Sequence, residues 1–506
     1  MPRLLVLPLL TTLLLFLLAQ PLPAEEKKED QQPVEDMVTS AHETTIGGKE
    51  IKYTVTVGKL PMKSDEGKPK AHIFFVAYTK HGVEDLGKRP LTFAFNGGPG
   101  SSSVWLHLGM LGPQRIRLPD DASHLRPPYE LSANPHSILD LTDLVFIDPV
   151  STGFSRPAEG EDKGQFHGYQ QDLNSVGEFI HHYLSEYGRW RSPKFLIGES
   201  YGGFRAAGLS GHLFNRYNIP ISGIVMVSPA TNFNTLSFAS GTDIGFALFL
   251  PSYTATAWYH KALPADLKQL PVDELYRQSH EFAMGEYLLA LAQGHDLDDD
   301  KRAAVAEKLS RLTGLSKTYV EQSNLRIPMQ RFGKELLRDR GLTIGRFDSR
   351  YTAMETDAVG DTPDFDPSAA AIFGPYTAAI NDYLREELKF DDHRVYEILT
   401  GNVHPWKYDN FGSRTPDTTD TLRETMTANP HMKVLFACGY YDLATPPGSV
   451  EYSASHLRLP KPLRENVKFT YYEGGHMMYV YEPAMEQLRK DVEAFYAEAL
   501  GDAEEK

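Results

Sequence analysis

The chain has 506 residues, of which 41% are hydrophobic and 23% are charged, and its formal net charge is −16 at neutral pH. This composition is that of an ordinary globular protein with a large core. The acidic balance, without a basic stripe along the chain, argues against nucleic acids and anionic membrane surfaces as partners.

The N-terminal segment has the pattern of an export signal. Arg3 supplies a positive start, residues 4–18 form an apolar run, and residues 21–24 (PLPA) supply a cleavage end. We therefore expect a signal peptide at residues 1–24 and no stable membrane contact once it is cleaved. An uncleaved anchor is the alternative, although the apolar run is shorter than a full membrane span. Residues 25–45 are expected to be a disordered lead-in, because the stretch up to Asp36 is charged and lacks aromatic side chains.

The first half of the chain alternates expected strands with expected helices. A helix at residues 168–189 is indicated by apolar side chains at helical spacing, among them Leu173, Val176 and Ile180. Such alternation with short connections predicts a mostly parallel central sheet flanked by helices. The expected strands are Ile51–Val57, His72–Tyr78, Leu91–Phe95, Leu144–Ile147, Phe195–Ile197 and Ile221–Val227, and the second helix is Tyr201–Phe214.

A G-x-S-x-G motif, residues 198–202, lies where the strand ending at Ile197 should turn into a helix. A serine between two glycines, here Ser200, can occupy a sharp turn that holds its hydroxyl above the sheet edge, where it can attack a carbonyl. A glycine-rich turn that serves packing alone is the alternative.

Between Pro229 and Pro430 the strand pattern gives way to helices. We interpret residues 230–430 as a helical insertion that caps the C-terminal edge of the sheet and shapes a pocket. A structural appendage or the contact surface of a homodimer is the alternative. The core is then formed by residues 46–229 and 431–506. The expected helices of the insertion are Glu274–Ala292, Lys301–Leu312, Ser316–Ser323, Pro328–Arg338 and Tyr376–Leu388, followed in the core by strands Met432–Cys438 and Val467–Tyr472 and a helix Glu482–Leu500.

Two residues after the insertion complete a catalytic triad. Asp442 follows the strand Met432–Cys438, and His476 follows the strand Val467–Tyr472. The order Ser, Asp, His, each just past a strand, is that of the α/β-hydrolase fold. We therefore predict Ser200 as the nucleophile, His476 as the general base and acid, and Asp442 as the group that orients the imidazole.

A glycine-rich loop, residues 96–103 (NGGPGSSS), follows the strand Leu91–Phe95. The α/β-hydrolase fold builds its oxyanion hole from the amide after the nucleophile, here that of Tyr201, and from an amide of this early loop. Glycine lets the backbone approach a substrate with no Cβ in the way. A flexible turn would be the default for this loop alone, but the G-x-S-x-G motif favours the functional interpretation.

Together these motifs resemble the serine carboxypeptidase family. The resemblance implies an α/β-hydrolase fold and an enzyme that hydrolyses C-terminal peptide bonds of peptides with a free C-terminus through an acyl-enzyme intermediate. Secreted eukaryotic members generally carry several disulfides, whereas Cys438 is the single cysteine here, so a bacterial periplasm or exterior is expected. The resemblance rests on residues 96–100 (NGGPG), Ser102, Ser103, 111–113 (LGP), 146–150 (FIDPV), 153–155 (GFS), 198–202 (GESYG) and 475–477 (GHM), and on the place of Asp442.

The resemblance also assigns binding roles. The N–H groups of Gly98 and Tyr201 would form the oxyanion hole, and Asn96, Gly97 and Glu199 would hold the terminal carboxylate of the substrate. One carboxyl group can receive another only if one of the two is protonated, so such a site favours acidic pH. No metal or organic cofactor is implied.

The sequence departs from the family at the carboxylate-binding corner. Ala94 stands where the family usually has tryptophan, and Met110 stands where it has a glutamate that pairs with the acid at position 199; Ser101 replaces a common cysteine. Without that partner, Glu199 is expected to titrate as a single group. The departures keep an esterase, amidase or acyltransferase on the same triad as the alternative. A non-catalytic binding protein is the rival from another class.

Overall fold

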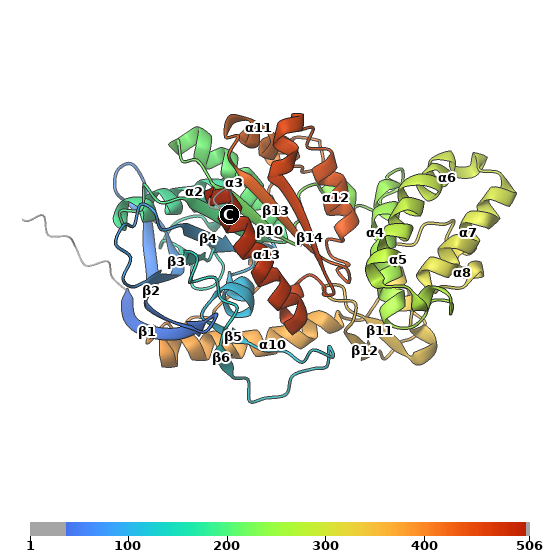
Figure 1. Ribbon diagram of the computed structural model, residues 1–506, viewed down its shortest axis with the longest axis horizontal. Helices are drawn as coiled ribbons and strands as arrows, with labels where there is room; N and C mark the ends of the chain where they lie inside the picture. Colours follow the sequence, from blue (N-terminus) through green and yellow to red (C-terminus); the bar gives the residue numbers. More distant parts are fainter. Residues whose placement is uncertain (1–36, 502–506) are drawn as a thin grey trace, which may run out of the picture. The chain divides into compact units, whose positions relative to one another are not determined.

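The structure, a computed structural model, describes residues 37–501 (Figure 1). The predicted signal peptide and the lead-in up to residue 36 lie outside the described residues. The last part of the predicted lead-in was wrong, because residues 38–46 form strand β1. This strand pairs antiparallel with β2 from Val38↔Val57 to Ile46↔Lys49. Its buried side chains, Thr44 and Ile46, come only at its end, so its sequence has little of the apolar pattern that marks a strand.

The main sheet has the order β1-β2-β3-β7-β4-β9-β10-β13-β14, with β8 paired to β3. Strands β7 to β14 in this order are parallel, whereas β1, β2 and β3 add an antiparallel edge. The predicted α/β-hydrolase class, with a mostly parallel central sheet, is therefore confirmed. The strands of the sheet are β1 (Val38–Ile46), β2 (Lys49–Lys63), β3 (Pro69–Lys80), β4 (Leu91–Phe95), β7 (Asp143–Ile147), β8 (Arg156–Pro157), β9 (Lys194–Glu199), β10 (Gly223–Val227), β13 (Lys433–Gly439) and β14 (Val467–Tyr472).

Two short hairpin-like sheets lie outside the main one. Strands β5 (Gln114–Ile116) and β6 (Leu131–Ala133) pair antiparallel, and so do β11 (Leu342–Ile344) and β12 (Thr352–Met354). The segment between β11 and β12 reaches the candidate site and is described there.

Helices cover both faces of the sheet. Successive side chains of a strand point to opposite faces, so a strand of continuous apolar sequence makes both faces apolar. On one face, Phe195 and Ile197 of β9 share a core with α13 (Glu482–Leu500) and the π-helical turn η1 (His107–Leu111). On the other face, Leu196 packs with α2 (Tyr169–Glu186), α3 (Tyr201–Tyr217) and α11 (Thr419–Ala428). The α-helices are α1 (Val104–Leu106), α2 (Tyr169–Glu186), α3 (Tyr201–Tyr217), α4 (Ile244–Tyr259), α5 (Val272–Phe282), α6 (Leu288–Gln293), α7 (Asp299–Thr313), α8 (Lys317–Gln322), α9 (Met329–Glu335), α10 (Pro367–Asp382), α11 (Thr419–Ala428), α12 (Pro447–Ser455) and α13 (Glu482–Leu500).

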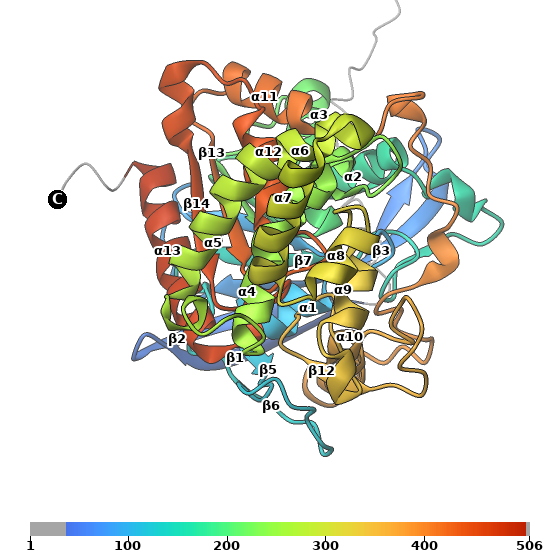
Figure 2. The same cartoon turned by 90° about the vertical axis from the view of Figure 1, so that its right-hand side faces the viewer.

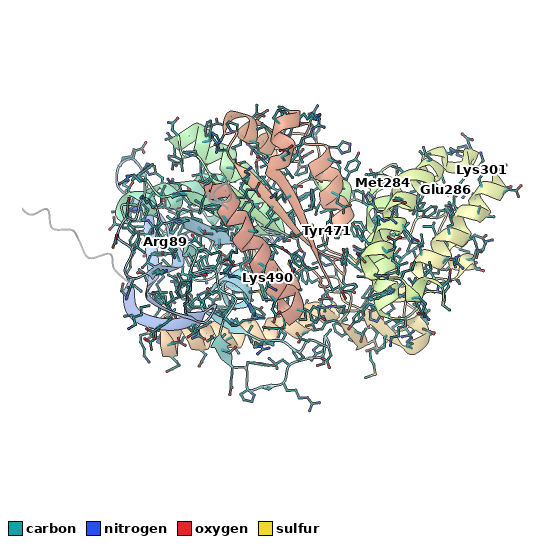
Figure 3. All side chains as sticks on the ribbon, in the orientation of Figure 1. Arg89, Met284, Glu286, Lys301, Tyr471 and Lys490 are labelled. Atoms are coloured by element: carbon teal, nitrogen blue, oxygen red, sulfur yellow. The ribbon has the colours of Figure 1, made fainter. Side chains whose placement is uncertain are left out.

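The segment between β10 and β13 divides into parts with different packing. Helices α4 to α9 form a lobe with its own apolar core, which includes Phe249, Tyr253 and Phe332. Figure 2 looks onto this lobe, and Met284, Glu286 and Lys301 are labelled on it in Figure 3. Helix α10 instead packs on the sheet side, with its side chains in the core that contains η1 and α13. Helix α11 packs on α3.

No helix among residues 37–501 combines the length and the apolar character needed to cross a membrane.

Candidate active site

The turn after β9 places Ser200 at the start of α3. The backbone of Ser200 has φ 61° and ψ −126°, a conformation that side-chain-bearing residues rarely adopt and that this turn stores as strain. The turn is fixed by a hydrogen bond from the Ser200 N–H to Val227 O (3.0 Å). A Cβ at Gly198 would lie 2.2 Å from the carbonyl oxygen of Gly202, so the strand can approach the helix this closely only with glycine there.

Asp442 and His476 form a buried pair. Both follow parallel strands, β13 and β14, and the Nδ1 of His476 lies 2.8 Å from the Oδ2 of Asp442. The other carboxylate oxygen, Oδ1, accepts hydrogen bonds from the backbone N–H groups of Ala444 (2.7 Å) and Thr445 (2.9 Å). The hydroxyl of Thr445 donates to Oδ2 (2.8 Å). The carboxylate is therefore held in one orientation toward the imidazole.

The charges of this pair stabilise each other. Burial alone would lower the pKa of His476, but the neighbouring carboxylate outweighs burial and leaves the pKa of the imidazole raised. Burial alone would raise the pKa of Asp442, yet the imidazole and the donors of Thr445 keep the pKa of that carboxyl below its usual value. An ionised Asp442 beside an imidazole that takes up a proton is the charge arrangement a general base requires.

Ser200 and His476 line the same cavity, which has a volume of about 370 Å³. The predicted site residues Asn96, Gly97, Gly98 and Glu199 line it as well. Asp442 lies behind the histidine and has no exposed surface. The remaining lining residues are Pro99, Ser101, Trp105, Arg346, Phe347, Ile372, Phe373, Leu399, Thr400, Gly401, His404 and Met477.

The glycine-rich loop lies directly against the start of α3. A Cβ at Gly97 would be 2.4 Å from the backbone nitrogen of Tyr201, so the loop reaches this position only because residue 97 is glycine. Tyr201 is the first residue of α3, and its N–H has no acceptor within the helix. In the part of the chain that the structure describes, no backbone carbonyl accepts the N–H of Gly98. Both amides predicted for the oxyanion hole therefore lack a backbone acceptor among the described residues, and Gly98 of the two lines the cavity.

Glu199 is held by two neutral donors. The Nδ2 of Asn96 donates to its Oε1 (3.0 Å), and the hydroxyl of Tyr479 donates to its Oε2 (2.5 Å). Met110, which stands where the family has a glutamate, is buried in η1. The hydrogen-bond partners of Glu199 in this chain are thus an amide and a tyrosine hydroxyl. No sequence signal points to Tyr479, because a tyrosine three positions after the histidine belongs to no motif.

The carboxyl group of Glu199 titrates near neutrality. Burial raises its pKa to about 7 against the opposing effects of His476 and of the hydrogen bonds from Tyr479 and Asn96. Below that pH the group is mostly protonated and can donate a hydrogen bond to an anionic ligand, which an ionised carboxylate cannot do.

The segment between β11 and β12, residues 345–351, joins the insertion to both triad loops. The carbonyl of Arg346 accepts the N–H of Leu443 (3.0 Å), and the carbonyl of Phe347 accepts the N–H of His476 (2.5 Å). The N–H of Ser349 donates to Tyr441 O (3.0 Å). These contacts are formed by the tertiary fold between residues more than 90 positions apart, so no local sequence pattern could reveal them.

A buried ion pair holds the backbone at the start of the glycine-rich loop. Arg205 of α3 and Asp172 of α2 are both almost fully buried, and Arg205 Nε lies 2.7 Å from Asp172 Oδ2. The same guanidinium donates through Nη1 to the carbonyl oxygen of Asn96 (2.5 Å). The ion pair therefore fixes the backbone of a residue that contacts Glu199.

One group of potential metal ligands occurs among residues 37–501. Ligand atoms of His136, Glu482 and Glu486 lie within 4.8 Å of one another. Glu482 already contacts the guanidinium groups of Arg115 (3.1 Å) and Arg117 (3.4 Å). Two guanidinium groups at this distance oppose a bound cation, so we assign no metal to this group.

Comparison with known proteins identifies the family. The model of the serine carboxypeptidase family matches residues 60–330, more than half of the chain. The chain belongs to the serine carboxypeptidase family. The resemblance to this family that the sequence motifs predicted is thereby confirmed. Asp442 and His476 of this serine carboxypeptidase family member lie beyond the matched residues, so their placement rests on the geometry described above.

Individual relatives match shorter stretches. The chain is 26% identical to serine carboxypeptidase-like 34 of Arabidopsis thaliana over 179 residues, which is 34% of this chain and 33% of that protein. It is 30% identical to the pheromone-processing carboxypeptidase KEX1 of Saccharomyces cerevisiae over 158 residues, 29% of this chain and 20% of the relative. The matched segments thus span only a fifth to a third of these relatives.

The likeness extends to a solved structure. A crystal structure of the prohormone-processing carboxypeptidase Kex1Δp from Saccharomyces cerevisiae superposes with a TM-score of 0.55 at 15% identity, and the match covers 88% of this chain and 91% of that one. At this identity the likeness shows a shared fold.

Proposed function

We propose that this chain is a serine carboxypeptidase that removes C-terminal residues from peptides. The observation that carries the proposal is the position of Glu199, a buried carboxyl group with a pKa of about 7, in the same cavity as Ser200 and His476. Glu199 and Asn96 can receive a carboxylate next to the reacting serine when Glu199 is protonated. A site for the free C-terminus beside a nucleophile selects the terminal peptide bond.

The proposed reaction has an acylation half and a deacylation half, and His476 acts first as base and then as acid in each. The Oγ of Ser200 attacks the scissile carbonyl carbon while the Nε2 of His476 takes the hydroxyl proton, and Asp442 stabilises the imidazolium. The oxyanion accepts hydrogen bonds from the amides of Gly98 and Tyr201. His476 then gives its proton to the leaving amine, which departs as the C-terminal amino acid. Water attacks the acyl-enzyme with His476 again as base, and Ser200 recovers its proton.

The test uses one N-blocked peptide as the free acid and as the C-terminal amide, at pH 4 to 8, with products identified by mass spectrometry. We expect stepwise loss of single residues from the free acid only, and no reaction with the variant Ser200→Ala. If neither peptide is cut while a simple ester is hydrolysed in a Ser200-dependent manner, the esterase alternative replaces the proposal. If a fluorophosphonate does not label Ser200, the chain is a non-catalytic binding protein.

We also propose that the protein is exported, with residues 1–24 as the cleaved signal. Its support is the apolar run after Arg3 and the cleavage end at residues 21–24. The single cysteine rules out an intrachain disulfide, which is why a bacterial compartment is proposed. N-terminal sequencing of the protein recovered from a periplasmic or culture fraction tests this. An intact Met1 in the membrane fraction would favour the uncleaved anchor.

A further inference from the structure

Arg346 brings a permanent positive charge to the candidate active-site cavity. It lies in the segment that joins the two triad loops, and its side chain is 45% exposed. Its backbone is fixed on both sides: its N–H donates to Asp366 Oδ1 (3.0 Å), and its carbonyl accepts from Leu443. The backbone position of Arg346 at the cavity is therefore set by the fold.

The guanidinium of Arg346 lies over the ring of Phe347, which is a neighbour of His476. It lies 4.3 Å from the ring centroid of Phe347, and that ring lies 5.3 Å from the imidazole of His476. This contact with the aromatic face does not consume the N–H donors of the guanidinium, because they lie in the plane of the guanidinium and point outward from its edge. The charge of Arg346 also acts on His476, where it opposes protonation of the imidazole.

The ion-pair partner of Arg346 among residues 37–501 is Asp366, and their contact is long. Oδ1 of Asp366 accepts the backbone N–H groups that begin α10 as well as that of Arg346, and its Oδ2 lies 3.9 Å from Arg346 Nε. Within residues 37–501, no acceptor forms a hydrogen bond with the Nη1 or Nη2 groups of Arg346. These donors remain available to a ligand.

The rest of the cavity favours a single anion at this point. Its other titratable lining groups are Glu199, His404 and His476, and no further carboxylate from the described part of the chain lines it. Much of the wall is apolar, with Trp105 and Phe373 among the lining side chains. In such a partly desolvated site a guanidinium binds a carboxylate in two-point geometry more tightly than it would in open water.

We propose that Arg346 binds a carboxylate of the substrate, as a second anion-binding group of the cavity besides Glu199 and Asn96. The carboxylate comes either from an acidic side chain next to the scissile bond or from the free C-terminus itself. The inference rests on the proposed peptidase function and adds an anionic preference to it.

The experiment compares N-blocked dipeptides that differ only in charge. The mature chain and its variants are given Ala-Glu against Ala-Gln, Glu-Ala against Gln-Ala, and each free acid against its amide, with a neutral ester as reference. We compare ratios of kcat/KM at one pH, because a ratio cancels any effect of Arg346 on the pKa of His476. Arg346→Gln removes the charge, and Arg346→Lys keeps it without the planar fork.

Arg331→Gln is the matched control. This arginine is also exposed and ion-paired, with Asp361 at 3.0 Å, and it belongs to the same insertion, but it does not line the cavity. It loses one charge from the same part of the chain, so a long-range effect of net charge would appear in both variants.

If an acidic side chain is the ligand, the native chain prefers glutamate over glutamine at one position by roughly 10- to 100-fold, and Arg346→Gln abolishes this preference. If the C-terminus is the ligand, Arg346→Gln instead lowers the preference for free acids over amides by a similar factor. In both cases Arg346→Lys retains part of the preference, and Arg331→Gln and ester hydrolysis are unchanged.

The inference is overturned if Arg346→Gln changes neither ratio while the peptides are cut. If only the ester is hydrolysed, the peptidase function fails by itself. Inhibition of ester hydrolysis by N-blocked glutamate, N-blocked glutamine and N-blocked glutamine amide, which carry two, one and no carboxylates, then decides the role of Arg346. Inhibition that Arg346→Gln leaves unchanged for all three rejects it, and a weakening confined to inhibitors that carry a carboxylate retains it.

Discussion

The variant Tyr479→Phe tests how the carboxyl group next to the predicted nucleophile is tuned. The hydroxyl of Tyr479 donates to Glu199 Oε2 over 2.5 Å, and both side chains are buried. A hydrogen bond to a charged group contributes about 1.5–3 kcal/mol, and one pKa unit corresponds to about 1.36 kcal/mol. Since this bond lowers the pKa of Glu199 against the effect of burial, its loss should raise that pKa by about one to two units above about 7.

The assay is the pH dependence of kcat/KM for an N-blocked dipeptide with a free C-terminus and for a neutral ester. This parameter reports the ionisation of the free enzyme. If protonated Glu199 holds the substrate carboxylate, the alkaline limb for the dipeptide moves up by about one to two pH units in Tyr479→Phe. The ester lacks a carboxylate, so its alkaline limb stays in place.

Tyr376→Phe is the control for loss of a buried hydroxyl. The hydroxyl of Tyr376 is buried near Tyr479, since a Cβ at Gly109 would lie 2.5 Å from atoms of both side chains. It has no hydrogen-bond partner among the described residues. Its removal should leave both profiles unchanged. An equal shift for dipeptide and ester, or a shift in Tyr376→Phe as large as that in Tyr479→Phe, would refute the reasoning.

Three further predictions concern the predicted machinery and its support. Asp442→Asn should lower kcat on the ester by about 10³- to 10⁴-fold with little change in KM, because asparagine favours the wrong imidazole tautomer; steady-state kinetics would contradict this with a loss below about tenfold. Glu199 has a pKa of 4.5 when exposed and about 7 when folded, so the folded chain binds the extra proton and the free energy of unfolding falls by roughly 3 kcal/mol as pH rises through that window. Glu199→Gln lacks this decline. Urea unfolding at pH 4.5 and 7.5 should therefore show that the free energy of unfolding of the variant, relative to that of the native chain, increases with pH. A difference that stays constant would count against a raised pKa of Glu199. Asp172→Ala leaves Arg205 buried without its partner and should destabilise the fold by about 3–5 kcal/mol, whereas a change under about 1 kcal/mol in denaturant unfolding would show that the pair contributes little.

Much of the fold was predictable because apolar runs and helical spacing are local signals. The strands that precede Ser200 and Asp442 are short and buried on both faces, so their sequences are almost continuously apolar. The strand that precedes His476, β14, lies at the sheet edge and was predictable from its β-branched and aromatic residues instead. Helix α4 was not predicted. It is buried over nearly its whole length and contains Pro251, so its sequence lacks the amphipathic period that marks a helix. Helix α10 begins at Pro367, with Asp366 as its cap, whereas its predicted start was Tyr376. Pro375 lies inside the helix and interrupts the helical pattern of the sequence.

The candidate site was predictable only where a motif fixes the backbone. Ser200 and the glycine-rich loop lie in turns that demand glycine, and the order of Asp442 and His476 follows from the sheet. Tyr479 and Arg346 gain their positions from contacts with distant segments, Glu199 in one case and the two triad loops in the other. Such contacts leave no periodicity or spacing in the chain.

The segment at residues 345–351 limits how this protein can be rebuilt. Its three main-chain hydrogen bonds to Tyr441, Leu443 and His476 make part of the insertion a structural element of the catalytic loops. A minimal enzyme obtained by cutting out the whole insertion would lose the scaffold that sets the acid and the histidine in register. Exchange of modules between relatives should therefore keep residues 345–351 and replace only the outer helices α5 to α8.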